Sequence, residues 1–451
     1  RRVWATAILG GLLFLVFGFA NYFVVQFRGQ PILPWDIQGF GTALTVSGGY
    51  VYEPTPLMTL VAMAFLFVVA LCVKTAPREK PGKTLRLAER TISLGVGVML
   101  FVMLFPMDVM TDMGISVWAW NQKTSSEITG ITAGFFANIQ FLMVDKPEGY
   151  SSAQVEEVSE EASPLGEPEP VGEPEQLPTI IAIMNESFTD MGAVGEGSIT
   201  LEPDNLSFFH SLQESGDVVW GTAYSSVYGG NTCNSEYEFL NGNTTAFLPT
   251  GSKPYQQYVD HEQTSLVSLL KDTYDYECIA IHPGQRSAWQ RDTAYEYLGF
   301  DEFIDVSQFD VHRTLEHGMT SDASSYDQVI YEYEHRDEDK PLFLFNVTIQ
   351  NHGGYENEDF ENTVQIKEAP GEYPQAEQYL SLVQKSDEAL EDLIGYFSQQ
   401  EDPVVILFFG DHWPNLEEEF YSLLLGDNAD DLSFKNVMRE YQVPFLIWAN
   451  Y

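Results

Sequence analysis

Long uncharged, apolar runs near the start of the chain constrain its fold most strongly. Residues 3–27 contain no charged side chain, and residues 54–73 form a second uncharged run. A helix of about 25 residues reaches about 37 Å, more than the about 30 Å hydrocarbon core of a membrane. A third, shorter uncharged run covers residues 91–107, for which a buried core helix is the alternative. The sequence therefore predicts a transmembrane region over residues 1–110, with three spans.

Basic residues are distributed unevenly around these runs. Segment 74–90 contains six Lys or Arg residues, and Arg1 and Arg2 precede the first run, whereas loop 28–53 has only Arg28. Because basic loops remain on the cytoplasmic side of a membrane, we expect Arg1 and segment 74–90 inside the cell. Three spans then place the rest of the chain outside. This pattern predicts a multi-pass protein of the cell membrane with an extracellular domain.

Two segments of different character follow the apolar runs. Residues 111–146 mix polar residues with large apolar ones, among them Trp118, Trp120, Phe135, Phe136, Phe141 and Leu142. This juxtamembrane segment is expected either to lie on the outer leaflet as an amphipathic helix or to pack on the soluble domain. Residues 147–178 are rich in Glu and Pro and contain no Lys or Arg. Self-repelling chains of this kind do not form a core, so we expect an acidic, disordered linker.

The overall composition excludes several classes of protein. The chain has 22 Lys and Arg residues against 66 Asp and Glu residues, giving a formal net charge of -44. Nucleic-acid-binding proteins need a basic face, so no nucleic acid partner is expected. Three Cys residues cannot form a disulfide scaffold. Hydrophobic residues make up 44% of the chain, which is enough for a substantial core.

Short apolar runs alternate with helical patterns in residues 179–451. The runs are TIIAIMN (179–185), ECIAIHP (277–283), LFLFNVTIQ (342–350), PVVILFFGD (403–411) and VPFLIWANY (443–451). Between the third and fourth runs, apolar residues recur with helical spacing at Leu390, Leu393, Ile394 and Phe397. Runs that are apolar throughout are typical of parallel strands covered on both faces. The pattern predicts a doubly wound α/β domain with a mostly parallel sheet.

Acidic or His side chains follow four of these runs. They are Glu186, His282, His352, Asp411 and His412. Ligands of open parallel sheets bind outside the carboxyl ends of the strands, so we expect these side chains to converge on one edge. One acidic residue after a strand is commonly just a helix cap, but four such strands indicate a site. Carboxylates with an imidazole suit Mn²⁺, Mg²⁺ or Zn²⁺, and the sequence does not choose between these ions.

The segment YGGNTCNSEYEFLNG (228–242) offers a nucleophile at Thr232. Gly229 and Gly230 permit unusual backbone angles and a close approach of the backbone to a ligand. A helix that begins near Thr232 would direct free N–H groups at an anion. The alternative is an ordinary Thr at a helix N-cap. Cys233 has no neighbour that would activate a thiol, so we do not expect it to be the nucleophile.

Five motifs, in this order, resemble the lipoteichoic acid synthase family. They are MNESF (184–188), GGNTCNSEYEFLNG (229–242), HPGQRSAWQRDTAYEYLGFDEF (282–303), TIQNHGGY (348–355) and FFGDHWP (408–414). Members of this family are membrane-anchored phosphoglycerol transferases of the alkaline phosphatase/sulfatase superfamily. The resemblance is close over 179–451 and loose over roughly 20–145. It implies a sulfatase-like catalytic domain at 179–451, expected to be truncated at its C-terminus because family members continue past the segment that matches 443–451.

The resemblance also implies roles for individual residues. Four would surround one divalent metal ion, usually Mn²⁺ in the well-known members: Glu186, Thr232, Asp411 and His412. Thr232 would be the nucleophile, and the substrate would be bound by His282, Arg291 and His352. The implied reaction transfers glycerophosphate from phosphatidylglycerol to a hydroxyl of a polymer or glycolipid acceptor, such as lipoteichoic acid, through a phospho-threonine intermediate.

Other functions remain open at this point. A phosphoethanolamine transferase of the same superfamily would use the same metal and Thr, but its better-known members carry several disulfides. A phosphodiesterase, or a non-catalytic surface protein that uses the fold for binding, are further alternatives. The sulfatase signature of Cys or Ser followed by x-Pro-x-Arg is absent after Cys233. This argues against sulfate ester hydrolysis through formylglycine.

Overall fold

The computed structural model describes ten parts of the chain. They are residues 3–28, 31–37, 52–75, 91–97, 99, 122–139, 151–154, 176–248, 251–426 and 433–451. The chain forms two compact units. The N-terminal unit contains Arg1–Phe40, Ser47–Leu142 and Pro249–Gly251, and the C-terminal unit contains Gly41–Val46, Met143–Leu248 and Ser252–Tyr451.

Two helices of the N-terminal unit are long and apolar enough to cross a membrane: Trp4–Phe27 (24 residues) within α1 (Val3–Arg28), and α3 (Pro56–Lys74, 19 residues). Only 6% of the apolar window of each helix is buried, whereas a core helix of a soluble protein would be mostly covered. Of the third predicted span, residues 91–97 are helical with exposed side chains, and 98 and 100–107 lie outside the described residues.

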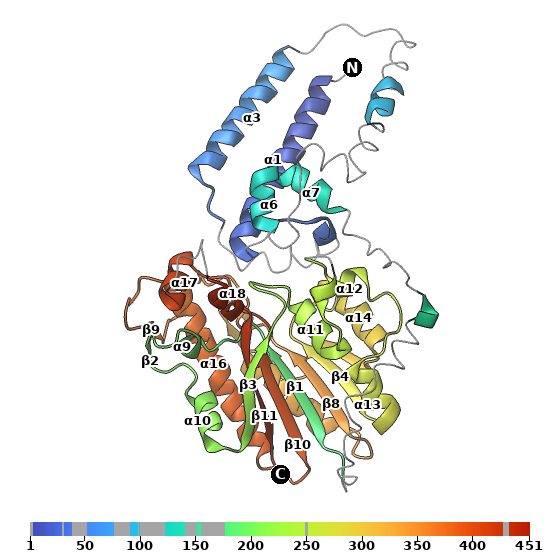
Figure 1. The fold of residues 1–451 in the computed structure, drawn as a ribbon, viewed down its shortest axis with the longest axis vertical. Coiled ribbons are helices and arrows are strands. Elements are labelled where there is room, and N and C mark those ends of the chain that lie inside the picture. Colours follow the sequence, from blue (N-terminus) through green and yellow to red (C-terminus); the bar gives the residue numbers. More distant parts are fainter. Residues whose placement is uncertain are drawn as a thin grey trace. The chain divides into compact units, whose positions relative to one another are not determined.

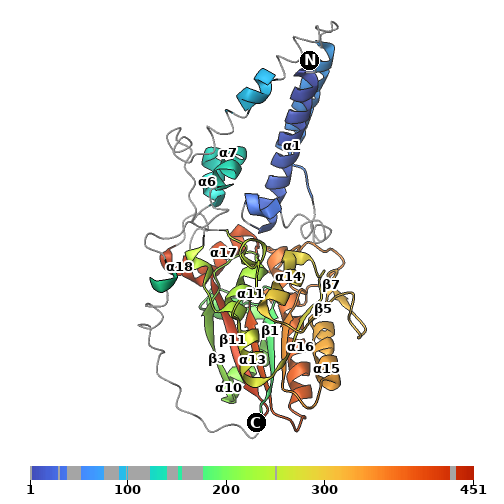
Figure 2. The same ribbon diagram turned by 90° about the vertical axis from the view of Figure 1, so that its right-hand side faces the viewer.

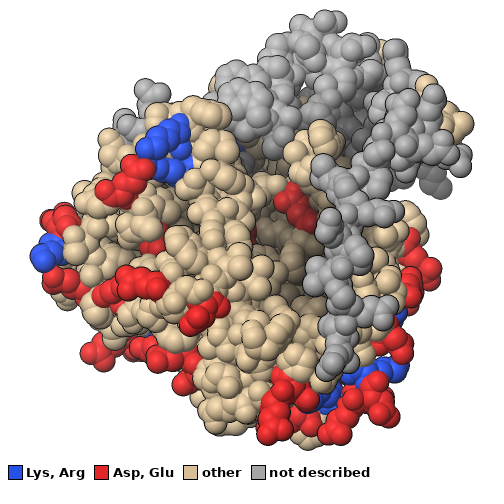
Figure 3. Space-filling model, turned by 60° about the horizontal axis from the view of Figure 1, so that its bottom comes forward, with Lys and Arg blue, Asp and Glu red and all other residues tan. Residues whose placement is uncertain are grey.

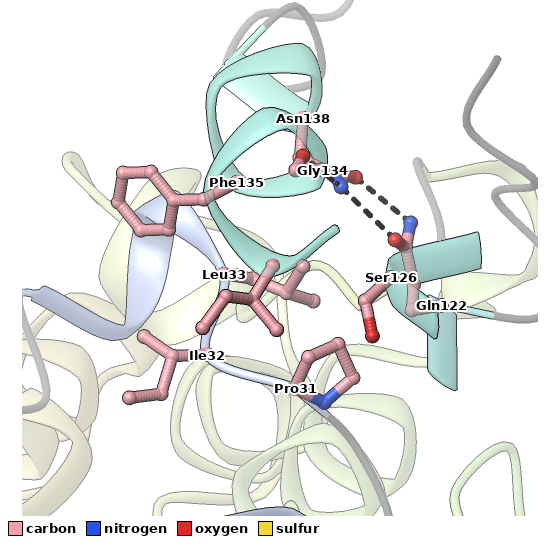
Figure 4. Close-up of a pocket in the computed structure, with 9 residues that line it drawn as sticks. Pro31, Ile32, Leu33, Gln122, Ser126, Gly134, Phe135 and Asn138 are labelled. Carbon is pink, nitrogen blue, oxygen red and sulfur yellow. Dashed lines mark hydrogen bonds between the residues drawn. The ribbon is translucent and has the colours of Figure 1, made fainter. Parts of the chain in front are cut away.

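Two short helices, α6 (Gln122–Thr129) and α7 (Ile131–Ala137), form the described part of the predicted juxtamembrane segment. Gln122 and Asn138 exchange two side-chain hydrogen bonds of 2.8 and 3.0 Å, which tie the two helices together (Figure 4). Phe135 of α7 packs edge-to-face on Phe17 of α1, with ring centroids 5.4 Å apart. This part of the segment therefore packs on the first apolar helix. Trp118, Trp120, Phe141 and Leu142 lie outside the described residues.

The C-terminal unit is built on a seven-stranded sheet in the order β3-β11-β10-β1-β8-β4-β5 (Figure 1). The strands are β1 (Thr179–Asn185), β3 (Val218–Tyr224), β4 (Glu277–His282), β5 (Glu302–Asp305), β8 (Leu342–Val347), β10 (Val404–Gly410) and β11 (Gln442–Ala449). Two small ribbons pair β2 (Leu201–Glu202) with β9 (Gln365–Ile366), and β6 (Leu315–Glu316) with β7 (Met319–Thr320). The mostly parallel sheet and all five predicted strands are confirmed.

The direction of β11 differs from the prediction. The run VPFLIWANY was expected to be a parallel strand, but β11 is antiparallel to both β10 and β3. An apolar run reports burial and carries no information on strand direction, which explains the error. The edge strand β3 was missed because Gly221 and Thr222 interrupt its apolar run after three residues. The strand β5 was missed because it is short.

Helices cover both faces of the sheet (Figure 1 and Figure 2). They are α9 (Met191–Val194), α10 (Ser207–Ser215), α11 (Thr232–Asn241), α12 (Pro254–Gln257), α13 (Leu266–Tyr274), α14 (Arg291–Leu298), α15 (Asp322–His335), α16 (Pro374–Phe397), α17 (Glu418–Leu425) and α18 (Phe434–Arg439). Successive residues of β1 alternate between two cores. Ile181 and Ile183 pack with α10, α15, α16 and α17, whereas Ala182 and Met184 pack with α11, α13 and α14. Both faces are therefore apolar, as predicted for a doubly wound domain.

Acidic side chains dominate the charged surface of the described residues. On the face shown in Figure 3, Asp and Glu are spread widely, and Lys and Arg form a few small patches. Several of the Lys residues already pair with carboxylates, such as Lys367 with Glu202 and Lys435 with Glu196.

Candidate functional site

The carboxyl ends of β1 and β10 bring three predicted metal ligands together. The two strands pair in parallel, with Asn185 opposite Gly410, so Glu186 and Asp411 leave the sheet side by side. One ligand atom from each of Glu186, Asp411 and His412 lies within 4.8 Å of the others, and all three residues are buried. His412 Nε2 is 3.1 Å from Asp411 Oδ2 and 3.7 Å from Glu186 Oε1.

Thr232 reaches this cluster from the first turn of α11. The residues before it, Gly229, Gly230 and Asn231, all have positive φ angles (67°, 139° and 73°), which turn the chain sharply into the helix. The Gly229 N–H donates to the carbonyl oxygen of Trp413 (3.1 Å) and so fixes the turn beside the end of β10. Thr232 Oγ1 donates to Glu186 Oε2 (3.2 Å) and lies 3.5 Å from His412 Nε2. The structure thus gathers all four residues for which metal contact was predicted.

The cluster carries uncompensated negative charge. Burial raises the pKa of Glu186 and of Asp411 above their ordinary values. Within the described residues, no Lys or Arg forms an ion pair with either carboxylate, and Asp411 Oδ2 is buried without a hydrogen-bond donor in suitable geometry. Buried carboxylates are stable only when they are paired, protonated or bound to a metal. The cluster therefore has the electrostatics of a cation site.

The orientation of His412 also fits a metal. Its Nδ1 lies 2.8 Å from the carbonyl oxygen of Trp413, so this nitrogen carries the hydrogen and Nε2 presents a lone pair to the carboxylates. The carboxylates are held as well, because Asp411 Oδ1 accepts from the N–H groups of Ser187 (2.7 Å) and His412 (2.8 Å). Two carboxylates, one imidazole and a hydroxyl are donors suited to a divalent cation. The residues present fit such an ion, and their chemistry leaves Mn²⁺, Mg²⁺ and Zn²⁺ open.

His282 and His352 were both predicted to bind substrate. His282 is the last residue of β4, and His352 follows β8 on the same edge. His282 Nδ1 donates to the carbonyl oxygen of Val347 (2.9 Å), which leaves Nε2 as an acceptor. Burial, followed by the charge of Arg291, lowers the pKa of His282 well below its ordinary value. Burial likewise lowers the pKa of His352, so both imidazoles are neutral. Gly284 is required beside them, since a Cβ there would lie 2.4 Å from His282 Nε2.

Arg291 is buried at the start of α14 and bound to Glu236, a residue that the sequence analysis did not single out. Arg291 Nε lies 3.0 and 3.1 Å from the two Glu236 carboxylate oxygens, and Nη2 lies 2.5 Å from Oε1. Tyr295 Oη donates to the same carboxylate (2.6 Å). Glu236 lies one turn after Thr232 on α11, so this pair fastens the first turn of α14 to the helix that carries Thr232. Arg291 Nη1 makes no hydrogen bond within the described residues.

Cys233 is not a competing nucleophile. It is fully buried, and burial raises the pKa of its thiol to about 12. A thiol in this state is protonated and inert, as predicted from the sequence.

A polar network beneath the site supports the strand ends. Asp322 is fully buried, and its Oδ2 accepts from Asn185 Nδ2 (2.6 Å) and Ser386 Oγ (2.6 Å). Asn351 Nδ2 donates to Asn185 Oδ1 (3.1 Å). Asn185 and Asn351 immediately precede Glu186 and His352, so the network holds two strand ends of the site in register. No local signal in the sequence pointed to Asp322.

Comparisons with known proteins extend these observations. The sulfatase family profile matches residues 178–451. A protein of Rhizobium meliloti named for cyclic beta-1,2-glucan modification is 30% identical over 340 residues, which cover 73% of this chain and 50% of that protein. The lipoteichoic acid synthase of Staphylococcus aureus is 25% identical over 211 residues, which cover 46% of this chain and 32% of the synthase.

A solved structure is also similar. The Streptococcus pyogenes phosphoglycerol transferase GacH, in complex with sn-glycerol-1-phosphate, aligns with a TM-score of 0.55 at 21% identity, over 68% of this chain and 77% of that chain. This likeness confirms the alkaline phosphatase/sulfatase-like fold. The chain spans half or less of the length of the curated relatives described above. With its family match covering more than half of its residues, the chain belongs to the sulfatase family.

Proposed function

We propose that the protein is a metal-dependent phosphoglycerol transferase that acts at the outer face of a membrane. One observation carries this proposal: the hydroxyl of Thr232, at the start of α11, lies against Glu186 and His412 in a buried cluster that fits a divalent cation. The names of the related phosphoglycerol transferase and lipoteichoic acid synthase support the same reaction class.

The chain's own residues suit a two-step transfer. Thr232 Oγ1 donates its hydrogen to Glu186, which leaves the oxygen lone pairs available for attack on phosphorus. A bound divalent ion would increase the acidity of the hydroxyl and neutralise phosphate charge. The N–H groups at the start of α11 face the same region and stabilise an anion. Thr232 and not Cys233 is therefore the nucleophile.

The two steps balance as follows. The bond from Thr232 Oγ1 to phosphorus forms, the bond from phosphorus to the diacylglycerol oxygen breaks, and the Thr232 proton ends on diacylglycerol. In the second step the acceptor oxygen bonds to phosphorus, Thr232 leaves, and the acceptor proton returns to Thr232. The donor in this scheme is phosphatidylglycerol, and the acceptor is a hydroxyl of a cell-envelope polymer or glycolipid.

Arg291, His282 and His352 bind the donor head group in this scheme. Arg291 Nη1 provides a charged donor for a phosphate oxygen. His282 Nε2 is an acceptor and suits a glycerol hydroxyl better than protonation of a leaving group, because the ring is neutral and its Nδ1 hydrogen is engaged. The acidic surface opposes an anionic lipid only weakly, since exposed charges are screened beyond about 8 Å at physiological salt.

Anchoring by the apolar helices would keep the catalytic unit close to a lipid substrate. In this proposal α1 and α3 are membrane spans, and residues 179–451 are the extracellular catalytic domain. The multi-pass topology also needs the third span expected at 91–107, and the expected tether is 147–178; most residues of both segments lie outside the described parts of the chain.

The test is release of diacylglycerol from fluorescent phosphatidylglycerol by the full chain in detergent with Mn²⁺. We expect Thr232→Ala to abolish release. The matched control is Thr293→Ala, an exposed Thr on α14, which should retain it. Undiminished release by Thr232→Ala would remove Thr232 from the mechanism. Release from phosphatidylethanolamine in preference to phosphatidylglycerol would instead assign a phosphoethanolamine transferase.

A further inference from the structure

A cavity that none of the metal-site residues lines lies between α9 and α10 on one side and β3 and β11 on the other. Its volume is about 380 Å³, within the range of about 300–1,000 Å³ that small-molecule sites occupy. The polar and aromatic residues that line it include Asp190, His210, Gln213, Glu214, Trp220 and Gln442. The proposed transfer mechanism uses none of them.

Trp220 gives the cavity an aromatic wall. It lies on the edge strand β3 and is 52% exposed, although Trp is usually largely buried in a folded protein. The next residue, Gly221, packs its backbone closely on Phe445 of β11: a Cβ at this position would lie 3.0 Å from the Phe445 ring. The indole therefore stands on a firmly packed strand pair and presents a large, rigid surface for a ligand.

The polar walls of the cavity consist of carboxylates, amides and one imidazole. His210 Nε2 lies 2.9 Å from Asp190 Oδ2, and His210 Nδ1 lies 2.9 Å from Asp204 Oδ2. Both ring nitrogens are therefore already occupied. Gln213 and Glu214, farther along α10, make no side-chain hydrogen bond within the described residues, so both can bind a ligand. No Lys or Arg is among the described residues that line the cavity.

These features point to one class of ligand. A polyanion such as polyglycerophosphate would meet Asp190 and Glu214 with no unpaired cation to balance its charge. An uncharged saccharide would place the C–H face of a ring on Trp220 and direct its hydroxyls to the carboxylate of Glu214 and the amide of Gln213. Uncharged hydroxyls satisfy these donors and acceptors without an opposing charge.

We propose that this cavity is a binding site for an uncharged glycan, which serves as the acceptor of the transferred glycerophosphate. The acceptor role rests on the proposed function, whereas glycan binding does not. Asp190, one of the residues that line the cavity, comes four residues after Glu186 in the chain. A glycan held there would therefore lie along the loop that follows the metal-site end of β1.

The binding test uses the full chain in detergent and isothermal titration calorimetry. The probes are neutral β-1,2-, β-1,3- and α-1,4-linked glucan oligosaccharides and a polyglycerophosphate oligomer of matched length. We expect at least one neutral glucan to bind, and polyglycerophosphate to bind at least tenfold more weakly. Trp220→Ala should weaken glucan binding at least tenfold. The control Val219→Ala, at a neighbouring residue that is 64% exposed and does not line the cavity, should not.

Several results would overturn the proposal. They are absence of binding to every neutral glucan at millimolar concentration, glucan binding that survives Trp220→Ala, and tighter binding of polyglycerophosphate. Equal melting temperatures of the two variants exclude misfolding as the cause of any loss. A separate assay distinguishes the two proposals: Trp220→Ala should release diacylglycerol at the wild-type rate in a single turnover without acceptor, but should transfer glycerophosphate to an added glucan at least tenfold more slowly. If the wild-type protein releases no diacylglycerol, the proposed function is refuted, and the glycan-binding proposal is unaffected.

Discussion

The buried pair of Arg291 and Glu236 provides a sharp test of how the site is held together. The perturbation is Glu236→Gln, which keeps the shape of the side chain and an acceptor for Tyr295 but removes the charge that faces Arg291. The side chains of Arg291 and Glu236 are 2% and 0% exposed, so solvent cannot replace the lost charge. Burial acts to lower the pKa of Arg291, and the neighbouring Glu236 outweighs this effect and raises it, so the variant leaves a buried guanidinium without the carboxylate that offsets its burial.

The expected loss of stability follows from this burial. Removing one partner of a buried ion pair lowers the free energy of unfolding by about 3–5 kcal/mol. Because Glu236→Gln leaves a polar amide in place, we expect a loss of about 3 kcal/mol. The C-terminal unit has about 300 residues and an unfolding entropy of about 2.1 cal/mol/K per residue, so about 3 kcal/mol corresponds to a fall in Tm of about 5 °C. Thermal unfolding of the full chain in detergent, followed by circular dichroism, measures it. The double variant Arg291→Met with Glu236→Gln should recover most of the stability, because no charge remains to desolvate and the amide still accepts from Tyr295.

Activity separates this structural effect from the effect on substrate binding. The double variant should remain inactive in diacylglycerol release, since Arg291 contacts the phosphate in our scheme. The control Glu202→Gln removes one partner of the exposed pair with Lys367 and should leave the Tm unchanged. A Glu236→Gln variant as stable as the wild-type protein would refute the reasoning that this pair fastens α14 to α11.

Three further predictions concern the metal, the pH dependence and the thiol. Removal of divalent ions with a chelator should abolish diacylglycerol release, and added Mn²⁺ should restore it. Calorimetry of Asp411→Asn should show Mn²⁺ binding at least tenfold weaker than in the wild-type protein. Release that persists in chelator would contradict the metal site. The hydrogen bond that protonated His210 donates to Asp190, opposed by burial, raises the pKa of His210 to about 9. The stabilisation by this bond is therefore complete below about pH 6.5 and lost as pH rises toward about 9; discounted for solvent screening it amounts to about 1 kcal/mol. Denaturant unfolding should show this loss of stability in the wild-type protein and not in His210→Gln. Native Cys233 should not react with iodoacetamide at pH 8 and Cys233→Ala should keep its activity, whereas rapid alkylation at Cys233 would contradict its burial.

Local sequence patterns predicted the parts of the fold that depend on burial. Five apolar runs became strands, and the helical spacing of Leu390, Leu393, Ile394 and Phe397 became part of α16. The residues that follow β1 and β10 met because parallel neighbours place their carboxyl ends on one edge. Strand direction in β11 and the exposed edge strand β3 were not predictable in this way. The first depends on the path of the connecting chain, and the second has an apolar run of only three residues.

The contacts that support the site were harder to predict than the site itself. Glu236 acts through Arg291, which lies 55 positions away in the chain, and Asp322 acts through Asn185, which lies 137 positions away. Neither carboxylate stands out in a chain with 66 acidic residues. Their roles depend on burial and on long-range pairing, which no periodicity in a single sequence records.

The most direct measurement for the central claim is peptide mass spectrometry of the protein after incubation with phosphatidylglycerol and Mn²⁺ in the absence of acceptor. Our account predicts a glycerophosphate ester on the peptide that contains Thr232, lost in Thr232→Ala and consumed when an acceptor is added. Diacylglycerol release with no adduct on this peptide, or with the adduct on a different residue, would contradict it.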